Sequence, residues 1–445
     1  MIDYISEWQF IADAYNGTGG FYDGSYLDKF KRESDGTKDS TDNAYGDRKD
    51  ASKREYENIF QSKVSKYGGY LFKSPPMRQS DDKLIQGIYE DVNRQNESSD
   101  VFMSKFAGNA KARGVNCLLV DVPKEKATDR KDQLDKRLTP YFMEILPERI
   151  TEYKLDRFGN FEYVAFSDTV DNSTYGNPKV DDIIRYYDKT EWRIYSSGGE
   201  IIDSAEHGFS KCPVLIFSES GEFESVGEFS QLAGMSKKLF NLDSELKLLL
   251  RGQTFSILTI WTEAGSSPTI NLGIDNALLY SGDHPPSYIS SDVAQAKTYE
   301  DKITEVKKSM DRVAYDTSTT EAKESGIALS IKFEGLNSSL NSFAQKMENL
   351  EREAWDLVCE NLNMNKETIS IVYNMEFSII DIYGEIDILD SINAIVDLPQ
   401  YKATKLKSII REDLKGFEDD VMLGIYDEID TLAKIAEAPT DDNIE

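Results

Sequence analysis

The most regular feature of the chain is a series of apolar residues spaced alternately four and three positions apart. Nine successive positions of this rhythm are apolar: Leu329, Phe333, Leu336, Leu340, Phe343, Met347, Leu350, Ala354 and Leu357. Such spacing places one narrow apolar stripe along a single helix of roughly 50 Å, at 1.5 Å per residue. Charged residues between 348 and 356 fall on the other side, so we expect a long helix with one solvated face.

The region before this long helix predicts two further helices around a small insertion. A second heptad-spaced series predicts a helix over 293–313, and 228–251 has an apolar side of its own. Between them, an apolar strand candidate at 255–261 and several Gly and Pro residues indicate a compact β-rich insertion. Helices that bracket a short insertion are expected to pack as an antiparallel pair. The stretch 316–326 is polar and turn-rich, which predicts an exposed loop.

The first 220 residues predict an α+β fold. Helical patterns lie at 3–16, 54–72, 81–95 and 99–112. Strand-like segments lie at 115–122, 141–155, 161–167, 182–187, 191–195 and 213–217. The charged stretch 29–53 predicts a loop or an exposed helical connector. Beyond the long helix we expect a strand over 368–380 and three helices at 385–398, 402–415 and 417–436, before an acidic tail at 437–445.

Charge and composition narrow the possible partners. The chain has 445 residues and a formal net charge of −29. Nucleic-acid binders neutralise phosphates with clustered Lys and Arg, so this chain is not expected to grip nucleic acid. One interpretation is a solvated acidic surface that aids solubility, and another is a surface that nucleic acid passes without sticking. Without a basic-then-apolar leader or an 18-residue apolar run, we expect a soluble protein made in a reducing cytoplasm, with no membrane contact.

Motifs for catalysis, metal binding and cofactor binding are missing from the sequence. There is no P-loop, dinucleotide fingerprint, HExxH or GxSxG pattern. Three widely separated cysteines indicate neither a disulfide framework nor a zinc site. The only histidines, His207 and His284, are too far apart in sequence to predict a base or ligand pair. We therefore expect no enzyme activity, no metal and no cofactor.

The order of these elements resembles the portal protein of tailed bacteriophages over residues 56–432. The segment 141–149 looks like a wing segment of that family, and 212–217 followed by the helix at 228–251 resembles the strand that precedes the first stem helix. Ser325-Gly326-Ile327-Ala328-Leu329 is the most specific match, because a similar stretch joins the channel loop to the long wing helix in the family. The chain departs from the family in its short crown, which lacks a basic patch. Residues 1–55 match no part of the family.

The resemblance implies an α+β portal-like subunit with an antiparallel stem helix pair. The implied parts are a wing at 1–227 and 326–384 with a long kinked helix and a strand, stem helices at 228–252 and 293–313, a β-rich clip at 253–292, a tunnel loop at 314–325, and a helical crown at 385–436. It also implies a ring, usually of twelve subunits, at one capsid vertex of the virion, assembled in the host cytoplasm. The implied partners are the major capsid protein, terminase, tail adaptor proteins, and double-stranded DNA that passes through without sequence recognition.

Candidate site residues follow from that assignment. In the tunnel loop, the DNA-channel candidates are Asp316, Thr317, Ser318, Thr319, Thr320, Glu321, Lys323 and Glu324; the alternative is an ordinary exposed turn. The stem candidates for facing the channel are Lys237, Lys238, Lys297, Lys302, Lys307 and Lys308; the alternative is a solvated face paired with acids. The clip candidates for binding partners are Trp261, Gly265, Ser266, Ser267, Pro268, Asp283, His284, Pro285 and Pro286.

Two other classes of protein remain open. A coiled-coil-rich assembly or scaffold protein of a virion would explain the heptads, but it would not explain the β-rich first half. An enzyme would need a nucleophile and base pair, which the sequence does not indicate.

Overall fold

The computed structural model of the protein contains both helices and sheets, as the sequence predicts. The structure describes residues 3–28, 55–125, 128, 132–133, 136–253, 257–261, 277–280, 287–289, 294–316, 326–375, 377, 400, 402–404, 406–407, 410 and 424–431, with backbone only at 251–253, 257–261, 277–280, 287–289, 294 and 326–332. The chain forms two compact units, Met1–Phe377 and Ser378–Glu445.

The first unit begins with helices that belong to its core. These are α1 (Tyr4–Asn16), α2 (Gly19–Asp23), α4 (Ile59–Leu71), α5 (Lys83–Glu90) and α6 (Ser99–Arg113). Trp8, Ile11 and Phe21 are all buried, and the Trp8 indole donates a 2.9 Å hydrogen bond to the carbonyl of Ser225. Residues 3–28 therefore contribute to the hydrophobic core.

A three-stranded antiparallel sheet lies at the centre of this unit. Its order is β3 (Tyr141–Ile145), β2 (Val115–Asp121), β9 (Val214–Ser218). All seven residues of β2 are buried, which requires cover on both faces because side chains alternate along a strand. The helices α6 and α10 (Gly326–Asn361) pack against this sheet, and Phe343 and Trp355 of α10 contact Phe217 and Phe142. The sequence-predicted buried strand at 115–122 is confirmed.

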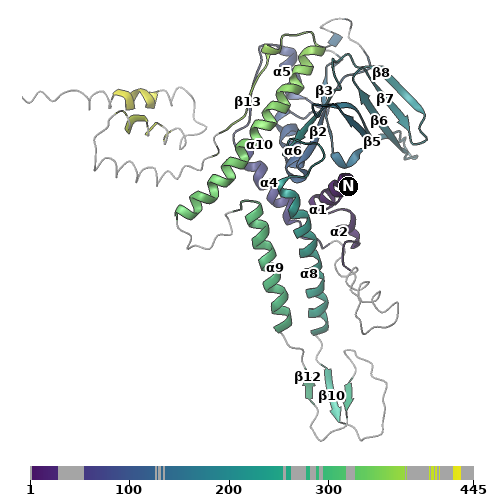
Figure 1. Cartoon of the computed structure of the whole chain (residues 1–445), viewed down its shortest axis with the longest axis vertical. Coiled ribbons are helices and arrows are strands. Elements are labelled where there is room, and N and C mark those ends of the chain that lie inside the picture. The colour runs from purple at the N-terminus through teal and green to yellow at the C-terminus, as the bar shows by residue number, and fades with distance from the viewer. Residues whose placement is uncertain are drawn as a thin grey trace, which may run out of the picture. The chain divides into compact units, whose positions relative to one another are not determined.

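A five-stranded antiparallel sheet follows the chain order (Figure 1). It consists of β4 (Ile150–Leu155), β5 (Phe161–Asp171), β6 (Val180–Asp188), β7 (Glu191–Ser196) and β8 (Ile201–Glu206). The sequence does not predict β8, because this strand lies at the sheet edge and buries none of its side chains, so its apolar and polar residues do not alternate. The other four strands lie within or beside the predicted segments.

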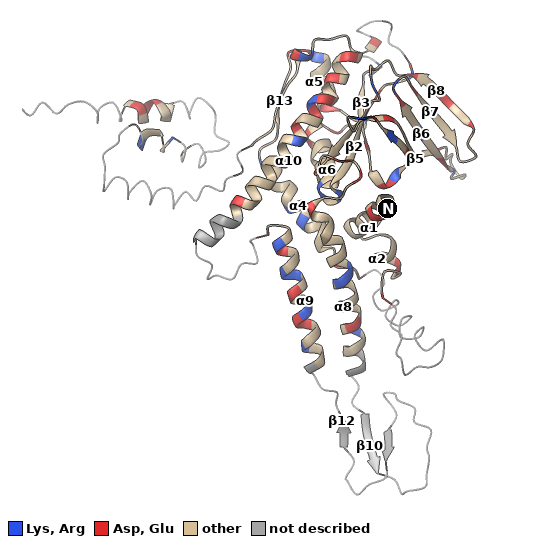
Figure 2. Cartoon of the chain, viewed as in Figure 1, with Lys and Arg blue, Asp and Glu red and all other residues tan. Residues whose placement is uncertain are grey.

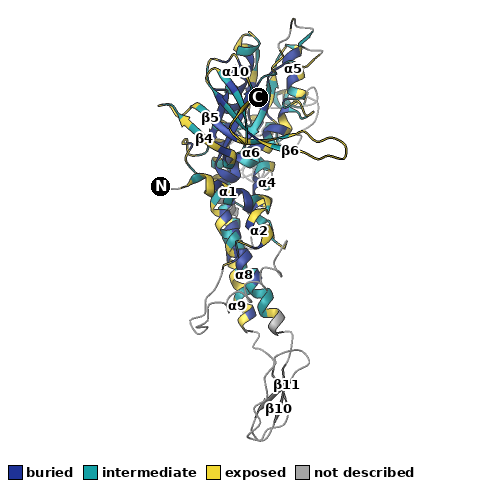
Figure 3. Cartoon of the chain, turned by 90° about the vertical axis from the view of Figure 1, so that its right-hand side faces the viewer, coloured by how far each residue is buried: buried dark blue, intermediate teal, exposed yellow. Residues whose placement is uncertain are grey.

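The predicted antiparallel helix pair is present. The helices α8 (Gln231–Gln253) and α9 (Ala294–Val313) lie side by side (Figures 1 and 3), and the chain between them forms β10 (Ile257–Trp261), β11 (Ala277–Tyr280) and β12 (Ser287–Ile289) in the order β11-β10-β12. The α-helix begins at Gln231 and not at residue 228, because Glu228–Ser230 form a 3₁₀ turn.

The strand after the long helix is shorter than the sequence predicts. A short 3₁₀ turn (Lys366–Thr368) is followed by β13 (Ser370–Val372), which pairs with β1 (Met77–Gln79). The strand does not extend into the described residues 373–375 and 377, because its partner β1 is only three residues long. In the second unit, the described residues between 400 and 431 are helical; all except Gln400 lie within two of the predicted helices, and Lys407 pairs with Asp430 at 2.5 Å.

Candidate functional site

The lysines predicted to face a channel lie on α8 and α9, where acids lie close to several of them (Figure 2). The Lys307 ammonium is 2.8 Å from the Glu57 carboxylate, and Lys237 is 3.6 Å from Asp28. Lys302 pairs with Glu305 at 2.7 Å; that bond, together with the nearby charge of Lys238, holds the pKa of Glu305 below its usual value. Lys238, Lys297 and Lys308 have exposed side chains. The paired lysines at 237, 302 and 307 fit the alternative of a solvated face balanced by acids.

The C-terminal half of α8 carries apolar side chains that the fold buries only in part. Near its start, Leu232, Leu239 and Phe240 belong to the hydrophobic core. Further along, Leu246, Leu248 and Leu249 are only half-buried and lie outside that core, and Figure 3 shows burial decreasing in this direction. At 100° per residue these three leucines span about 160° of the helix surface. One packed helix covers a stripe of about 100°, so α9 alone does not cover this arc.

The base of the 314–325 loop is held by ion pairs. Asp316 follows α9, and its side chain is only 6% exposed. It accepts hydrogen bonds from Lys63 at 2.6 Å and from Lys66, while Lys63 also bonds Asp311 at 2.5 Å. Burial lowers the pKa of Lys63, but its bonds to the two aspartates outweigh that effect and raise it overall. Asp316, expected to face a channel, is instead a buried anchor; Thr317, Ser318, Thr319, Thr320, Glu321, Lys323 and Glu324 lie outside the described residues.

Glu228 forms a second anchor, which connects Tyr315 at the base of the 314–325 loop to the interior of the first unit. The Tyr315 hydroxyl donates to the Glu228 carboxylate, which also accepts from the Lys111 ammonium at 3.0 Å and from the Ser339 hydroxyl at 3.4 Å. Burial, and then the bond to Glu228, raise the pKa of Tyr315. These contacts connect the end of α9 with α6 and α10. They border an open cavity of about 570 Å³ that is also lined by Ser338, Ser342 and Lys346.

Lys111 is the buried centre of this anchor. Its side chain is 1% exposed, its ammonium is 2.6 Å from the Glu219 carboxylate, and it lies 4.5 Å and 4.4 Å from the ring centres of Tyr67 and Phe229. The chain brings both glutamates to it by wrapping segment 219–228 around the end of α6. That wrap requires glycine at 114, which has a φ of 84°, because a Cβ atom there would lie 1.9 Å from the Gly227 nitrogen.

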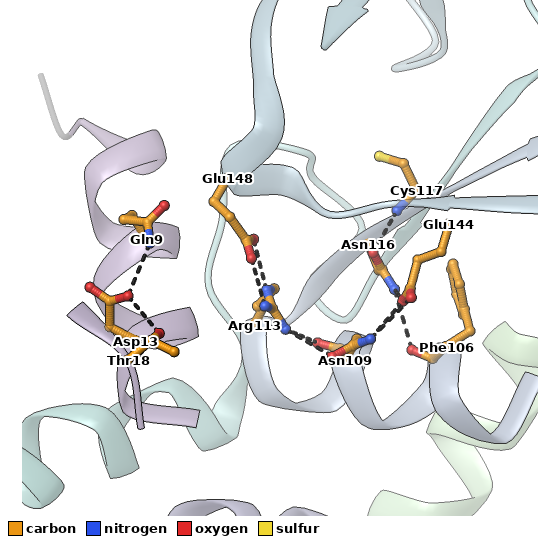
Figure 4. A network of polar contacts seen from close by, with 10 residues as sticks. All are labelled: Gln9, Asp13, Thr18, Phe106, Asn109, Arg113, Asn116, Cys117, Glu144 and Glu148. Carbon is orange, nitrogen blue, oxygen red and sulfur yellow. Dashed lines mark hydrogen bonds and ion pairs between the residues drawn. The ribbon is translucent and has the colours of Figure 1, made fainter. Parts of the chain in front are cut away.

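A separate polar network fixes α6 against the central sheet (Figure 4). The Arg113 guanidinium is fully buried and donates two hydrogen bonds, of 2.8 and 2.6 Å, to Glu148. Asn109 and Asn116 both donate to the Glu144 carboxylate, at 3.0 and 2.5 Å. Burial raises the pKa of Glu144. Because these groups hydrogen-bond one another, the network stabilises the packing of α6 on the sheet.

The structure describes few side chains of the remaining candidate residues. Trp261 ends β10 and pairs in register with Tyr280 of β11; Gly265, Ser266, Ser267, Pro268, Asp283, His284, Pro285 and Pro286 lie outside the described residues. His207 is buried and contacts the Asp188 carbonyl at 3.0 Å, and burial lowers its pKa. Among the described residues no His, Cys, Asp or Glu group is arranged to hold a metal ion. No helix in the described ranges has the length and apolar character needed to span a membrane.

The sequence did not indicate the anchors at Lys63, Lys111 and Glu228. The one local signal was Lys111, a charged residue near the end of a helix that leads directly into a buried strand. Its partners lie 108 and 117 positions away, so only the fold identifies them.

Comparisons with known proteins find similar solved structures only. No protein-family model matches the chain, and no curated protein matches it. Among solved structures, a chain in the virion of a native gene transfer agent particle has a TM-score of 0.40 and 10% identity, covering 78% of this chain and 89% of that one. A chain in the neck of an empty gene transfer agent particle, computed with C6 symmetry, has a TM-score of 0.40 and 12% identity, covering 78% and 90%. At these TM-scores, neither likeness bears on the function of this chain.

Proposed function

We propose that this protein is a structural component of a phage-type virion and, more specifically, its portal protein. In this role it forms a ring at one capsid vertex, through which double-stranded DNA is packaged and ejected. The ring contacts the major capsid protein, and its clip docks terminase and later the tail adaptor proteins. The observation that carries the proposal is the antiparallel pair α8 and α9 with its three-stranded insertion, followed by the long helix α10.

The apolar surface of α8 supports assembly into a ring. Leu246, Leu248 and Leu249 cover a wider arc than α9 can bury, so part of this arc is available to a neighbouring subunit. In a ring, each helix pair has a neighbour on either side. The neighbouring subunit then buries the half-buried leucines, and the subunit fold does not change.

The charge of the chain supports passage of DNA without tight binding. Twelve copies multiply the net charge of −29 twelvefold, before counterions condense. A channel lined with cations would hold DNA through repeated counterion-release contacts, whereas an acidic one keeps each contact weak. The pairing of Lys237, Lys302 and Lys307 with acids agrees with this, because a paired lysine offers less charge to a phosphate. We propose no catalytic role.

A coiled-coil scaffold protein of a virion is the less favoured alternative. Such a protein needs its heptads for association between long helices. In this chain, Leu336, Leu340, Phe343 and Met347 of the heptad series are buried within the subunit, against a core built from two sheets and several helices. The apolar stripe of α10 is therefore buried within the subunit, and it is not free to associate with another long helix.

Negative-stain microscopy and mass photometry of the purified full chain test the proposal. We expect rings with a central hole and a mass of roughly 600 kDa for twelve copies of 50.4 kDa. Leu248→Glu should shift the equilibrium toward single subunits, while Thr304→Glu, which adds the same charge at an exposed position of α9, should not. If the parent protein remains a 50.4 kDa species at all concentrations and salts, the proposal is wrong.

A further inference from the structure

The five-stranded sheet has one buried face and one outward face. Val164, Tyr187 and Trp192 are opposite one another on neighbouring strands, and all three are buried in the hydrophobic core. Side chains alternate between the two faces along each strand, so the residues between these positions project the other way. Within the described chain, none of the large side chains on that other face belongs to the core or packs against it.

The outward face carries a row of tyrosines with one arginine. The rings of Tyr163 and Tyr186 stack with centres 5.7 Å apart, and Tyr195 meets Tyr186 edge-on at 6.5 Å. The Arg193 guanidinium lies 5.5 Å from the centre of the Tyr186 ring. We call these four residues the tyrosine row. They come from β5, β6 and β7, so the row crosses three adjacent strands, near the start of β5 and the end of β6.

The tyrosine row is ordered before any partner arrives. All four side chains are half-buried. The Tyr163 hydroxyl donates to Glu152 at 2.9 Å, and Arg193 donates to Glu191 and, at 3.4 Å, to the Tyr195 hydroxyl. Side chains already fixed in place lose little rotamer entropy on binding. Tyr and Arg are also the residue types enriched at the energetic centres of protein interfaces.

Acidic residues lie on the same face as the row, some beside it and others further along the strands. By strand register these are Glu152, Asp171, Asp182, Asp188, Glu191 and Glu206. The bases on this face are Lys154 and Arg193, and each is already paired with a glutamate. The electrostatic potential over this face of the sheet is therefore negative. It repels nucleic acid, and it also disfavours a second copy of the chain placed face to face.

We propose that the tyrosine row is a docking surface for an arginine-rich segment of another protein. Guanidinium groups stack on tyrosine rings, as Arg193 already does on Tyr186, and they pair with carboxylates at the same time. A flat aromatic row with acids at its border offers both contacts to successive arginines. This inference does not depend on the proposed portal function, because it rests only on the outward face of the sheet.

The test measures binding of labelled peptides to the full chain by fluorescence anisotropy. The probes alternate glycine with six arginines, six lysines or six glutamates. We expect the arginine probe to bind most tightly and the glutamate probe not to bind. Removing two rings with Tyr186→Ala plus Tyr195→Ala should weaken arginine-probe binding by about tenfold, whereas Tyr186→Phe plus Tyr195→Phe should preserve it. The matched control is Tyr175→Ala, a fully exposed tyrosine outside the row.

Several outcomes would overturn the inference. One is an alanine double variant that binds like the parent; another is an equal loss of binding in Tyr175→Ala. Equal affinity for lysine and arginine probes would indicate general attraction to an acidic protein. A photo-reactive arginine probe provides a readout that does not depend on how well the variants fold, because its adducts in the parent protein should map to residues 163–195. Adducts elsewhere, or preferential capture of DNA or of a second copy, would also contradict the inference.

Discussion

Replacing Lys111 by methionine should loosen the interior of the first unit more than any nearby surface change. Methionine keeps the length and apolar stem of the side chain, so its contacts with Tyr67 and Phe229 largely remain. The lost group is the ammonium that pairs with Glu219 and Glu228. Both carboxylates then remain close together, with side-chain exposures of 17% and 36% and no shared cation.

The expected cost follows from that burial. Removing one partner of a buried ion pair costs about 3–5 kcal/mol, chiefly because the remaining charge is left without compensation. Because Glu219 and Glu228 keep some access to water and retain other donors, we expect the lower end, about 3 kcal/mol. The matched control is Lys105→Met on the same helix. Lys105 is 60% exposed and pairs with Glu97 at the surface, so its loss should cost below about 1 kcal/mol.

Native-state hydrogen exchange of the α6 amides measures this difference without requiring two-state unfolding of the whole chain. A loss of 3 kcal/mol raises the exchange rate of protected amides on the order of 100-fold, and Lys105→Met should change it less than about fivefold. Adding Glu219→Gln and Glu228→Gln to Lys111→Met should restore much of the protection, because the uncompensated charges are then gone. If Lys111→Met and Lys105→Met exchange alike, the reasoning about the buried ammonium is refuted.

Three further predictions concern Tyr315 at the base of the 314–325 loop, the buried acid Glu144, and the threonines of that loop. Tyr315→Phe removes one donor to Glu228 and should speed hydrogen exchange at 314–316 roughly fivefold, for a loss of about 1 kcal/mol, with unchanged exchange in β2; equal change in both would contradict a local anchor. Burial raises the folded-state pKa of Glu144 above its unfolded value, so stability falls as pH rises through that interval. The melting temperature of the parent, relative to Glu144→Gln, should therefore fall as the pH rises above about 4.3, the usual pKa of a glutamate, and a constant difference would argue against it. Replacing Thr317, Thr319 and Thr320 by lysine should add salt-sensitive DNA contact, roughly one counterion per lysine, and alter packaging or ejection but not capsid assembly; behaviour like the parent would remove this loop from the channel.

Local periodicity accounts for the parts of the fold that the sequence predicts well. The long helix, the pair α8 and α9, and the buried strand β2 each depend on residues within one turn or one pleat of each other, so their spacing is visible in the chain. The edge strand β8 has no such signal, because neither of its faces is buried. The sequence also does not predict the end of β13 at Val372, because the length of β1 decides it from almost 300 positions away.

For the candidate site, too, the sequence predicts where residues lie along the chain but not the partners that the fold brings to them. The positions of the candidate lysines on two helices follow from the sequence, but their partners Asp28 and Glu57 lie about 210 to 250 positions earlier. The polar stretch around Asp316 predicts an exposed channel residue. Burial of its carboxylate by Lys63 and Lys66 depends on how α4 packs beside the end of α9, which no local pattern encodes.

The bond between Lys63 and Asp316 has a consequence for how the protein is made. The lysine leaves the ribosome 253 residues before its aspartate does, and 248 before Asp311. At about 5–20 residues per second, α4 waits on the order of 10–50 seconds for its counter-ions. Throughout that interval the Lys63 ammonium has neither aspartate beside it and stays hydrated. Completion of the first unit is therefore a late event in synthesis, and a nascent chain halted before residue 311 should remain a client of chaperones.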